Sequence, residues 1–285
     1  MKLSVCSIAW RDKPVDHVFR MMAELGYRNA DLFASNSTGH AFRTLDPPAR
    51  DRIRRLGERH GIAIVSLAGA VGDGFTAERE ADRETELERV RAEIDLAADL
   101  GASVARIAPG AGTDPGPIMT RALPYLRRAA DYAEQKGLRL GMENHTGSIT
   151  ANPDQIAALC RAAGSRALGV IYDPGNLFGA LVDYKKGFET MRDFILHVHL
   201  KDGFPHYFGN DGFAPQRLSC TLFGEGQLDI PWIMDRLAAI GYAGYVSAEF
   251  ESWHPEYHLP VADEGLGQVR RYMERWFASC RGPLL

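Results

Sequence analysis

Eight short apolar segments alternate along this chain with eight segments of helical periodicity. The apolar segments span residues 2–8, 29–33, 62–67, 104–108, 138–143, 168–173, 194–201 and 244–251. The helical segments span residues 14–25, 48–60, 78–100, 117–135, 153–163, 184–191, 230–240 and 264–277. Strands that alternate with helices favour parallel pairing, because each helix crosses over the sheet between two strands.

Eight such units, at roughly 35 residues each, fit a closed (β/α)₈ barrel. This α/β fold uses about 250 residues as one domain. We therefore predict a single TIM-barrel domain over residues 1–285. The alternative is an open doubly wound sheet, which usually carries a glycine-rich phosphate loop after its first strand. Here the first strand is followed by the sequence AWRD, which contains no such loop.

Composition excludes several classes of protein. With 45% apolar and 25% charged residues, the chain is typical of a globular protein. Its formal net charge of −4 lacks the positive field that nucleic-acid binding usually needs. No apolar run reaches the roughly 18 residues of a membrane span, and early charges leave no signal-peptide core. The four cysteines are scattered, so we expect a cytoplasmic protein with reduced thiols and neither a nucleic-acid nor a membrane partner.

Four consecutive strands end in ionisable side chains. The C-terminal ends of barrel strands converge on one face, where catalytic groups lie. The side chains expected there are Glu143 in GMENH, Asp173 in YDPGN, His199 in HVHLKD and Glu249 in SAEFE. Three carboxylates this close together repel one another unless a cation neutralises them. The sequence therefore predicts one divalent metal ion held by these four residues.

The donor set of three oxygens and one nitrogen indicates which metal to expect. An octahedral ion accepts this set and keeps two positions for substrate oxygens or water, so Mn²⁺ fits best, with Mg²⁺ and Co²⁺ as alternatives. Zinc prefers four ligands with more nitrogen or sulfur. Taken singly, each carboxylate is more often an ion pair or a helix cap, and Asp173 before a proline fits a cap. His197 shares strand parity with His199, and we assign His199 as the ligand because it lies nearer the strand end.

Other polar residues at the same rim are candidates for contacting a substrate or supporting the ligands. The substrate-binding candidates are Lys201, Asn176, His145 and Arg106. For Lys201 the alternative is an ion pair with Asp202, and His145 could instead cap the following loop. Glu251 and the deeper His197 are expected behind the ligands, where they would orient them.

Two long connections could cover this rim. They span residues 203–227, which are rich in glycine and aromatic residues, and residues 252–262, which are rich in aromatic residues and proline. A connection of this length in a compact barrel is usually functional. We expect either connection to act as a lid over the site or to form a subunit contact in a homo-oligomer.

Together these motifs resemble the xylose-isomerase-like TIM-barrel superfamily of sugar phosphate isomerases and epimerases, which also includes metal-dependent apurinic endonucleases. The motifs that carry the resemblance are GMEN with Glu143, DPGN with Asp173, HVHLKD with His199, FGEG at residues 223–226 and SAEFE with Glu249. The resemblance spans essentially the whole chain and is strongest over residues 138–251. It implies a (β/α)₈ barrel with one catalytic divalent ion on the four ligands.

The chain departs from the DNA-repair branch of this superfamily. That branch carries additional histidines on the third and fourth strands, after the aspartate of the sixth strand and before GEG, and they hold two more metals. Here the third strand reads VSLA and the fourth reads RIAP, Asn176 stands in place of one histidine, and residues 218–221 offer none. A trinuclear metal cluster is therefore excluded, and with it the nuclease activity.

The remaining branch acts on carbohydrates, so we expect a small-molecule carbohydrate substrate. A metal that chelates adjacent carbonyl and hydroxyl oxygens polarises the carbonyl and makes the neighbouring C–H acidic enough for a carboxylate to remove. Glu143 and Glu249 could stand on opposite sides of the resulting enediolate as an acid–base pair, which resemblance to ketose 3-epimerases supports. Returning the proton to the opposite face epimerises the centre, and returning it to the next carbon isomerises the sugar. The leading hypothesis is an isomerase or epimerase of a keto-sugar or polyol-derived sugar.

Two alternatives remain open. The same enediolate can expel a β-leaving group, which would make the chain a lyase or dehydratase acting on a keto-inositol or an oxidised glycoside. His145 or Lys201 would then serve as the acid near the leaving group. The third alternative is a carbohydrate-binding barrel without catalysis, which the intact glutamates and ligands disfavour.

Overall fold

The computed structural model describes residues 1–35, 39–207, 216–254, 257 and 259–279, with the side chains at 206–207, 216–217 and 275–279 left outside the description. Eight parallel strands form one closed barrel in the order β1-β10-β7-β6-β5-β4-β3-β2. They are β1 Lys2–Cys6, β2 Asn29–Phe33, β3 Ala63–Ala68, β4 Val104–Arg106, β5 Arg139–Glu143, β6 Leu168–Tyr172, β7 Ile195–Leu200 and β10 Tyr245–Ala248. The predicted closed parallel barrel, a single TIM-barrel domain, is confirmed.

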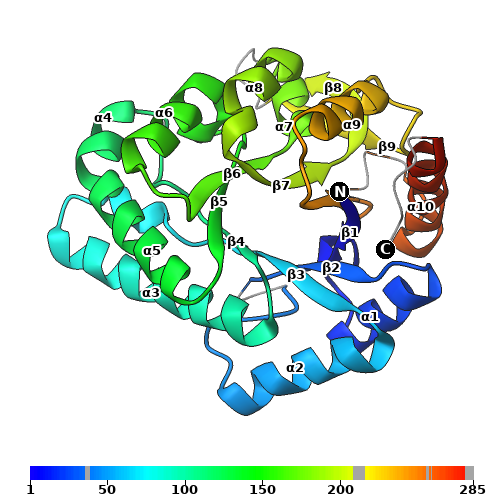
Figure 1. The fold of residues 1–285 in the computed structure, drawn as a ribbon, viewed down its shortest axis with the longest axis horizontal. Coiled ribbons are helices and arrows are strands. Elements are labelled where there is room, and N and C mark those ends of the chain that lie inside the picture. Colours follow the sequence, from blue (N-terminus) through cyan, green and yellow to red (C-terminus); the bar gives the residue numbers. More distant parts are fainter. Residues whose placement is uncertain (36–38, 208–215, 255–256, 258, 280–285) are drawn as a thin grey trace.

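Helices surround the barrel and cover the outer face of its strands (Figure 1). The long ones are α1 Val15–Glu24, α2 Pro47–His60, α3 Glu80–Leu100, α5 Leu123–Gln135, α6 Pro153–Ala163, α8 Tyr184–Met191, α9 Ile230–Ala239 and α10 Ala262–Ser279. These helices lie where the periodicity predicts them, with small shifts at their ends. Two short helices, α4 Pro115–Pro117 and α7 Pro174–Gly179, add to the pattern.

Local capping chemistry sets where the helices begin and end. The Asp46 side chain accepts a hydrogen bond from the Ala49 backbone nitrogen at 2.8 Å and starts α2. Gly61 ends the same helix with a φ of 67°, a left-handed conformation that glycine adopts without strain. The short helix α7 begins in the same way, because the Asp173 side chain accepts from the Asn176 backbone nitrogen.

The first and last parts of the chain close the barrel together. β1 pairs with β10 in parallel, with Lys2 opposite Tyr245 and Val5 opposite Ala248. Just beyond β1, the buried Trp10 donates from Nε1 to Asp263 Oδ1 at 2.6 Å, which fastens the short helix η1 (Ser7–Trp10) to the start of α10. This closure places the end of β1 at the rim, beside the end of β10.

The segment predicted as a long loop over residues 203–227 contains an antiparallel hairpin. β8 (Asp202–Tyr207) pairs with β9 (Gln216–Thr221), and residues 208–215 lie outside the described residues. The hairpin packs against α7 (Figure 1). The buried Asp202 carboxylate accepts hydrogen bonds from four backbone nitrogens, at Gly203, Gly224, Gly226 and Leu228. Asp202 therefore holds the FGEG turn in place. The ion pair between Lys201 and Asp202, which is the alternative role for Lys201, is not formed, because Lys201 pairs with Asp173, Glu249 and Glu251.

Two further observations concern membrane-spanning helices and the cysteines. No described helix is long and apolar enough to cross a membrane. Cys6, Cys160 and Cys220 are buried free thiols, whereas Cys280 lies outside the described residues.

Glu93 on α3 is a buried carboxyl behind the third strand. A side chain on Gly69 would collide with the Glu93 Oε1 atom, so the glycine makes room for this carboxyl. Burial raises the pKa of Glu93 to about 7, against the opposing charges of Arg43 and Arg50. Between pH 4.5 and 7 the folded chain therefore retains a proton that the unfolded chain has released. The free energy of unfolding falls as the pH rises through this range, then levels off.

We expect Glu93→Gln to stabilise the fold at pH 8 by about 1–3 kcal/mol, because it removes a buried charge. At pH 4.5 the gain should vanish, because the folded carboxyl is already neutral there. Urea unfolding at both pH values measures the difference. Glu88→Gln, exposed on the same helix, is the matched control. An equal gain at both pH values would show that charge burial is not the cause.

Candidate metal and substrate site

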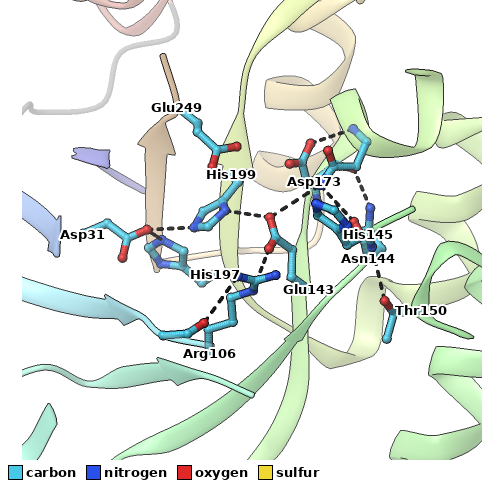
Figure 2. A network of polar contacts seen from close by, with 12 residues as sticks. Asp31, Arg106, Glu143, Asn144, His145, Thr150, Asp173, His197, His199 and Glu249 are labelled. Atoms are coloured by element: carbon cyan, nitrogen blue, oxygen red, sulfur yellow. Dashed lines mark hydrogen bonds and ion pairs between the residues drawn. The ribbon is translucent and has the colours of Figure 1, made fainter. Parts of the chain in front are cut away.

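Four buried side chains from four neighbouring strands meet at the C-terminal mouth of the barrel. Glu143 ends β5, Asp173 follows β6, His199 lies on β7 and Glu249 follows β10. Each offers one ligand atom, and these atoms all lie within 4.8 Å of one another. Figure 2 shows the carboxylates of Glu143 and Glu249 directed toward His199. The structure therefore brings together the four residues that the sequence predicts as metal ligands.

His199 sits between two carboxylates. Its Nδ1 lies 3.0 Å from Glu143 Oε1, and its Nε2 lies 2.7 Å from Asp31 Oδ2 (Figure 2). Burial opposes protonation, but Glu143 and Asp31 outweigh it and raise the pKa of His199 well above its ordinary value. Asp31, on β2, is fully buried and fixes the orientation of the imidazole. Because Nε2 faces Asp31, Nδ1 is the nitrogen turned toward the other candidate ligands.

His197 lies two residues before His199 on β7 and is also buried. Its ring packs edge-on against His199 with the ring centroids 5.4 Å apart, and its Nε2 lies 3.3 Å from Asp31 Oδ2. Burial lowers the pKa of His197. The three side chains of Asp31, His197 and His199 form a second buried group of metal-ligating type. In this arrangement the Asp31 carboxylate contacts both histidines and holds their rings in position.

Arg106, at the end of β4, forms an ion pair with the first candidate ligand. Its Nε lies 2.7 Å from Glu143 Oε2, and its guanidinium also donates to the backbone oxygen of Gly69. Burial would raise the pKa of Glu143, but the charges of Arg106 and His199 hold it well below its ordinary value. Glu143 is thus an anion at neutral pH. The structure thus places Arg106, a predicted substrate-binding candidate, against the Glu143 carboxylate.

The ammonium of Lys201, which follows β7, lies among the remaining carboxylates. Its Nζ is 2.6 Å from Glu249 Oε2, 3.0 Å from Asp173 Oδ2 and 3.5 Å from Glu251 Oε1. Burial opposes its charge, but these carboxylates raise the pKa of Lys201 well above its ordinary value. Glu251 therefore lies beside Lys201, and it also lines the neighbouring cavity.

Asn144, which the sequence reasoning did not single out, fixes the position of Asp173. Its Oδ1 accepts from the Asp173 backbone nitrogen at 2.9 Å, and its Nδ2 donates to the Asp173 backbone oxygen at 2.6 Å. Asn176 Nδ2 donates to the backbone oxygen of Asn144 at 3.1 Å and lies 3.5 Å from Glu143 Oε1. His145 is exposed, and its Nδ1 donates to the backbone oxygen of Thr146.

A polar cavity of about 290 Å³ opens beside these residues. Among its lining residues are Arg11, His145, Asn176, Lys201, Glu251 and Trp253. The predicted substrate candidates His145, Asn176 and Lys201 thus line one cavity. Part of the connection 252–262 forms its wall through Trp253, His254 and Tyr257, whereas residues 255, 256 and 258 lie outside the described residues.

The donor chemistry of the four-residue group fits one divalent cation. Burial raises the pKa of Asp173 to about 7 despite the charge of Lys201, and the carboxylates of Glu249 and Glu143 add to the rise. The Asp173 Oδ2 atom is buried and accepts no hydrogen bond from the described residues, although Lys201 Nζ lies near it. A bound cation would satisfy that oxygen and relieve the repulsion among the three carboxylates.

Two supporting residues escaped the sequence reasoning, and each had a signal. Asp31 is a carboxylate inside the apolar segment NADLF, where an unpaired charge would be costly. Asn144 directly follows Glu143 in the GMEN motif. In neither case does the sequence show the partner, because Asp31 meets His199 only through the closure of the barrel.

The curated relatives of this chain include sugar-processing enzymes. It is 24% identical to fructoselysine 3-epimerase of Shigella flexneri over 281 residues, which cover 95% of this chain and 97% of the relative. It is 22% identical to inosose dehydratase of Geobacillus kaustophilus over 311 aligned positions, covering 95% and 96%. These relatives support an enzyme with a carbohydrate substrate, and they include both epimerases and dehydratases.

Solved structures share the fold. A D-psicose 3-epimerase determined in the presence of D-fructose matches with a TM-score of 0.79 at 14% identity, covering 96% of this chain and 99% of that one. The IOLI protein with a bound zinc atom matches with a TM-score of 0.75 at 16% identity, covering 98% and 99%. At these identities the two structures show that the chain shares their fold.

The family described as xylose isomerase-like TIM barrel matches residues 19–275, which is most of the chain. This match agrees with the closed eight-stranded barrel. The chain belongs to the xylose isomerase-like TIM-barrel family.

Proposed function

We propose that this protein is a divalent-metal-dependent isomerase or epimerase of a keto-sugar or polyol-derived sugar, working by proton transfer through an enediolate. The observation that carries the proposal is the convergence of Glu143, Asp173, His199 and Glu249 within 4.8 Å. A divalent ion on these residues would polarise the substrate's carbonyl and acidify the neighbouring C–H. Mn²⁺ suits the donor set best, and the buried free thiols favour the cytoplasm.

Glu143 and Glu249 are the proposed acid–base pair. They come from β5 and from the end of β10, which β6 and β7 separate around the barrel. A substrate carbon between them would meet one carboxylate on each face. Arg106 keeps Glu143 ionised, whereas Lys201 donates to Glu249 at 2.6 Å. One glutamate removes the proton, and the other returns one to the opposite face.

Lys201, Asn176 and His145 are the proposed substrate-binding residues because they line the cavity beside this pair. The Lys201 ammonium would stabilise negative charge that develops on the enediolate oxygens. Arg106 acts through Glu143 rather than on the substrate. The connections 203–227 and 252–262 remain candidates for closing the cavity or for a homo-oligomer contact.

The second candidate function is a lyase or dehydratase acting on a keto-inositol or oxidised glycoside. Lys201 favours it, because its buried ammonium, between Asp173 and Glu249, would stabilise negative charge that develops on a leaving group. The similarity to inosose dehydratase agrees with this alternative. A barrel that binds carbohydrate without catalysis is disfavoured, because both glutamates and the other candidate ligands are present and lie together.

Proton exchange tests the acid–base pair directly. In D₂O with Mn²⁺, the wild-type protein should incorporate deuterium into a keto-sugar or an inosose, as followed by NMR across a panel of such compounds. Glu249→Gln should lower this exchange by at least about 10²-fold, because the amide cannot accept the proton. Glu264→Gln, exposed on α10, is the control and should exchange normally. Unchanged exchange in Glu249→Gln would refute its catalytic role.

Metal content tests the ligand assignment. His199→Ala should lose the bound ion, because it removes the nitrogen ligand, whereas His197→Ala should keep the ion and mainly lower stability. Asp31→Asn should weaken metal affinity about 10–100-fold, because Asp31 orients His199. Elemental analysis after dialysis against limiting Mn²⁺ measures all three. Retention by His199→Ala together with loss by His197→Ala would show that the histidine assignment is reversed.

Product mass separates the two candidate functions. An isomerase or epimerase conserves the mass of its substrate, whereas a dehydratase releases water and a glycoside lyase releases an alcohol. We expect mass spectrometry of the turnover products to show conserved mass, apart from exchanged deuterium in D₂O. Loss of about 18 mass units from a keto-inositol would instead establish the dehydratase.

A further inference from the structure

Arg11 is a cationic side chain at the cavity that the proposed reaction does not use. It directly follows η1, at the end of the first barrel strand, and it lines the 290 Å³ cavity together with Lys201 and Asn176. Trp10, its neighbour in sequence, is buried and fastened to Asp263. The backbone that carries Arg11 is therefore held firmly at the rim.

The guanidinium of Arg11 lies over the indole of Trp253, with its central carbon 5.3 Å from the ring centroid. Among the described residues, no carboxylate forms an ion pair with Arg11. A guanidinium that lies over an aromatic ring is attracted to the ring without losing its charge, so its N–H groups can still bind a planar anion. Arg11 is thus oriented by Trp253 without being neutralised.

The other charges at this cavity are already matched. Lys201 contacts Asp173, Glu249 and Glu251. Glu251 in turn faces both Lys201 and His254, whose Nε2 lies 3.8 Å from Glu251 Oε2. Arg11 is therefore a cation at the cavity wall for which the described residues provide no anionic partner.

We propose that Arg11 binds a carboxylate of the substrate, so that the substrate is an acidic sugar rather than a neutral one. This inference rests on the proposed function for the location of the reacting carbon, at the four-residue group. A guanidinium can bind a carboxylate through two parallel N–H···O bonds, which fixes the orientation of the far end of the substrate. One guanidinium also matches the single negative charge of a carboxylate. A phosphate ester is also an anion that a guanidinium can bind, so the test below includes a sugar phosphate for comparison.

Binding measurements test this without requiring turnover. Calorimetry on the Mn²⁺-loaded protein would compare D-glucuronate, D-glucose 6-phosphate and D-glucose, which share one sugar ring. Wild-type protein should bind glucuronate at least about tenfold more tightly than glucose. Arg11→Gln should reduce glucuronate affinity to that of glucose, and Arg11→Lys should fall between, because lysine keeps the charge but not the fork. Arg79→Gln, which removes an exposed guanidinium paired with Asp82, should bind like wild type.

Several outcomes would overturn the proposal. They are equal glucuronate affinity in wild type and Arg11→Gln, no detectable glucuronate binding by wild type, and a preference for glucose 6-phosphate over glucuronate. Circular dichroism melting of Arg11→Gln establishes that the variant is folded. The proposed function fails separately, through absence of deuterium exchange in the full panel while Arg11-dependent glucuronate binding persists. If neutral sugars exchange deuterium and Arg11→Gln changes nothing, the proposed function stands and the proposed carboxylate-binding role of Arg11 is wrong.

Discussion

Three carboxylates buried together at the mouth of the barrel are the constraint on which the rest of the site depends. Inside a medium of low dielectric constant such groups cannot all be anions without nearby positive charge. The chain supplies that charge from different strands, with Arg106 against Glu143 and Lys201 between Asp173 and Glu249. A divalent ion would complete this balance. The charge of Arg106 helps to keep Glu143 ionised, whereas the ammonium of Lys201 contacts both Asp173 and Glu249.

The barrel arranges these groups in layers. Side chains alternate between the two faces of a strand. His197 and His199, which are two residues apart on β7, therefore both point into the barrel. Asp31 lies on β2, which β1 and β10 separate from β7, and it contacts both rings. The candidate metal ligand is thus held from behind by a carboxylate, an arrangement typical of metal-binding histidines. Rigid strands hold the atoms that must be placed most accurately.

The residues that line the proposed substrate cavity lie largely on loops that follow the barrel strands. Arg11 follows the first strand, His145 follows the fifth, and Trp253 follows the last. Asp202 pins the FGEG turn through four backbone hydrogen bonds and so fixes the base of the β8–β9 hairpin beside the cavity. Binding residues on loops carried by a rigid scaffold allow one reaction centre to serve different substrates.

The sequence by itself determined the barrel and the four candidate ligands. Local periodicity marks the strands and helices, and parallel strands of a barrel bring their C-terminal ends to one face, so position along the chain suffices to place Glu143, Asp173, His199 and Glu249. Only the tertiary structure decided the partners. Arg106 pairs with Glu143, Lys201 pairs with Asp173 and Glu249, and Asp31 contacts His199, which lies 168 residues away along the chain. These contacts depend on side-chain direction and on barrel closure, which local sequence patterns do not encode.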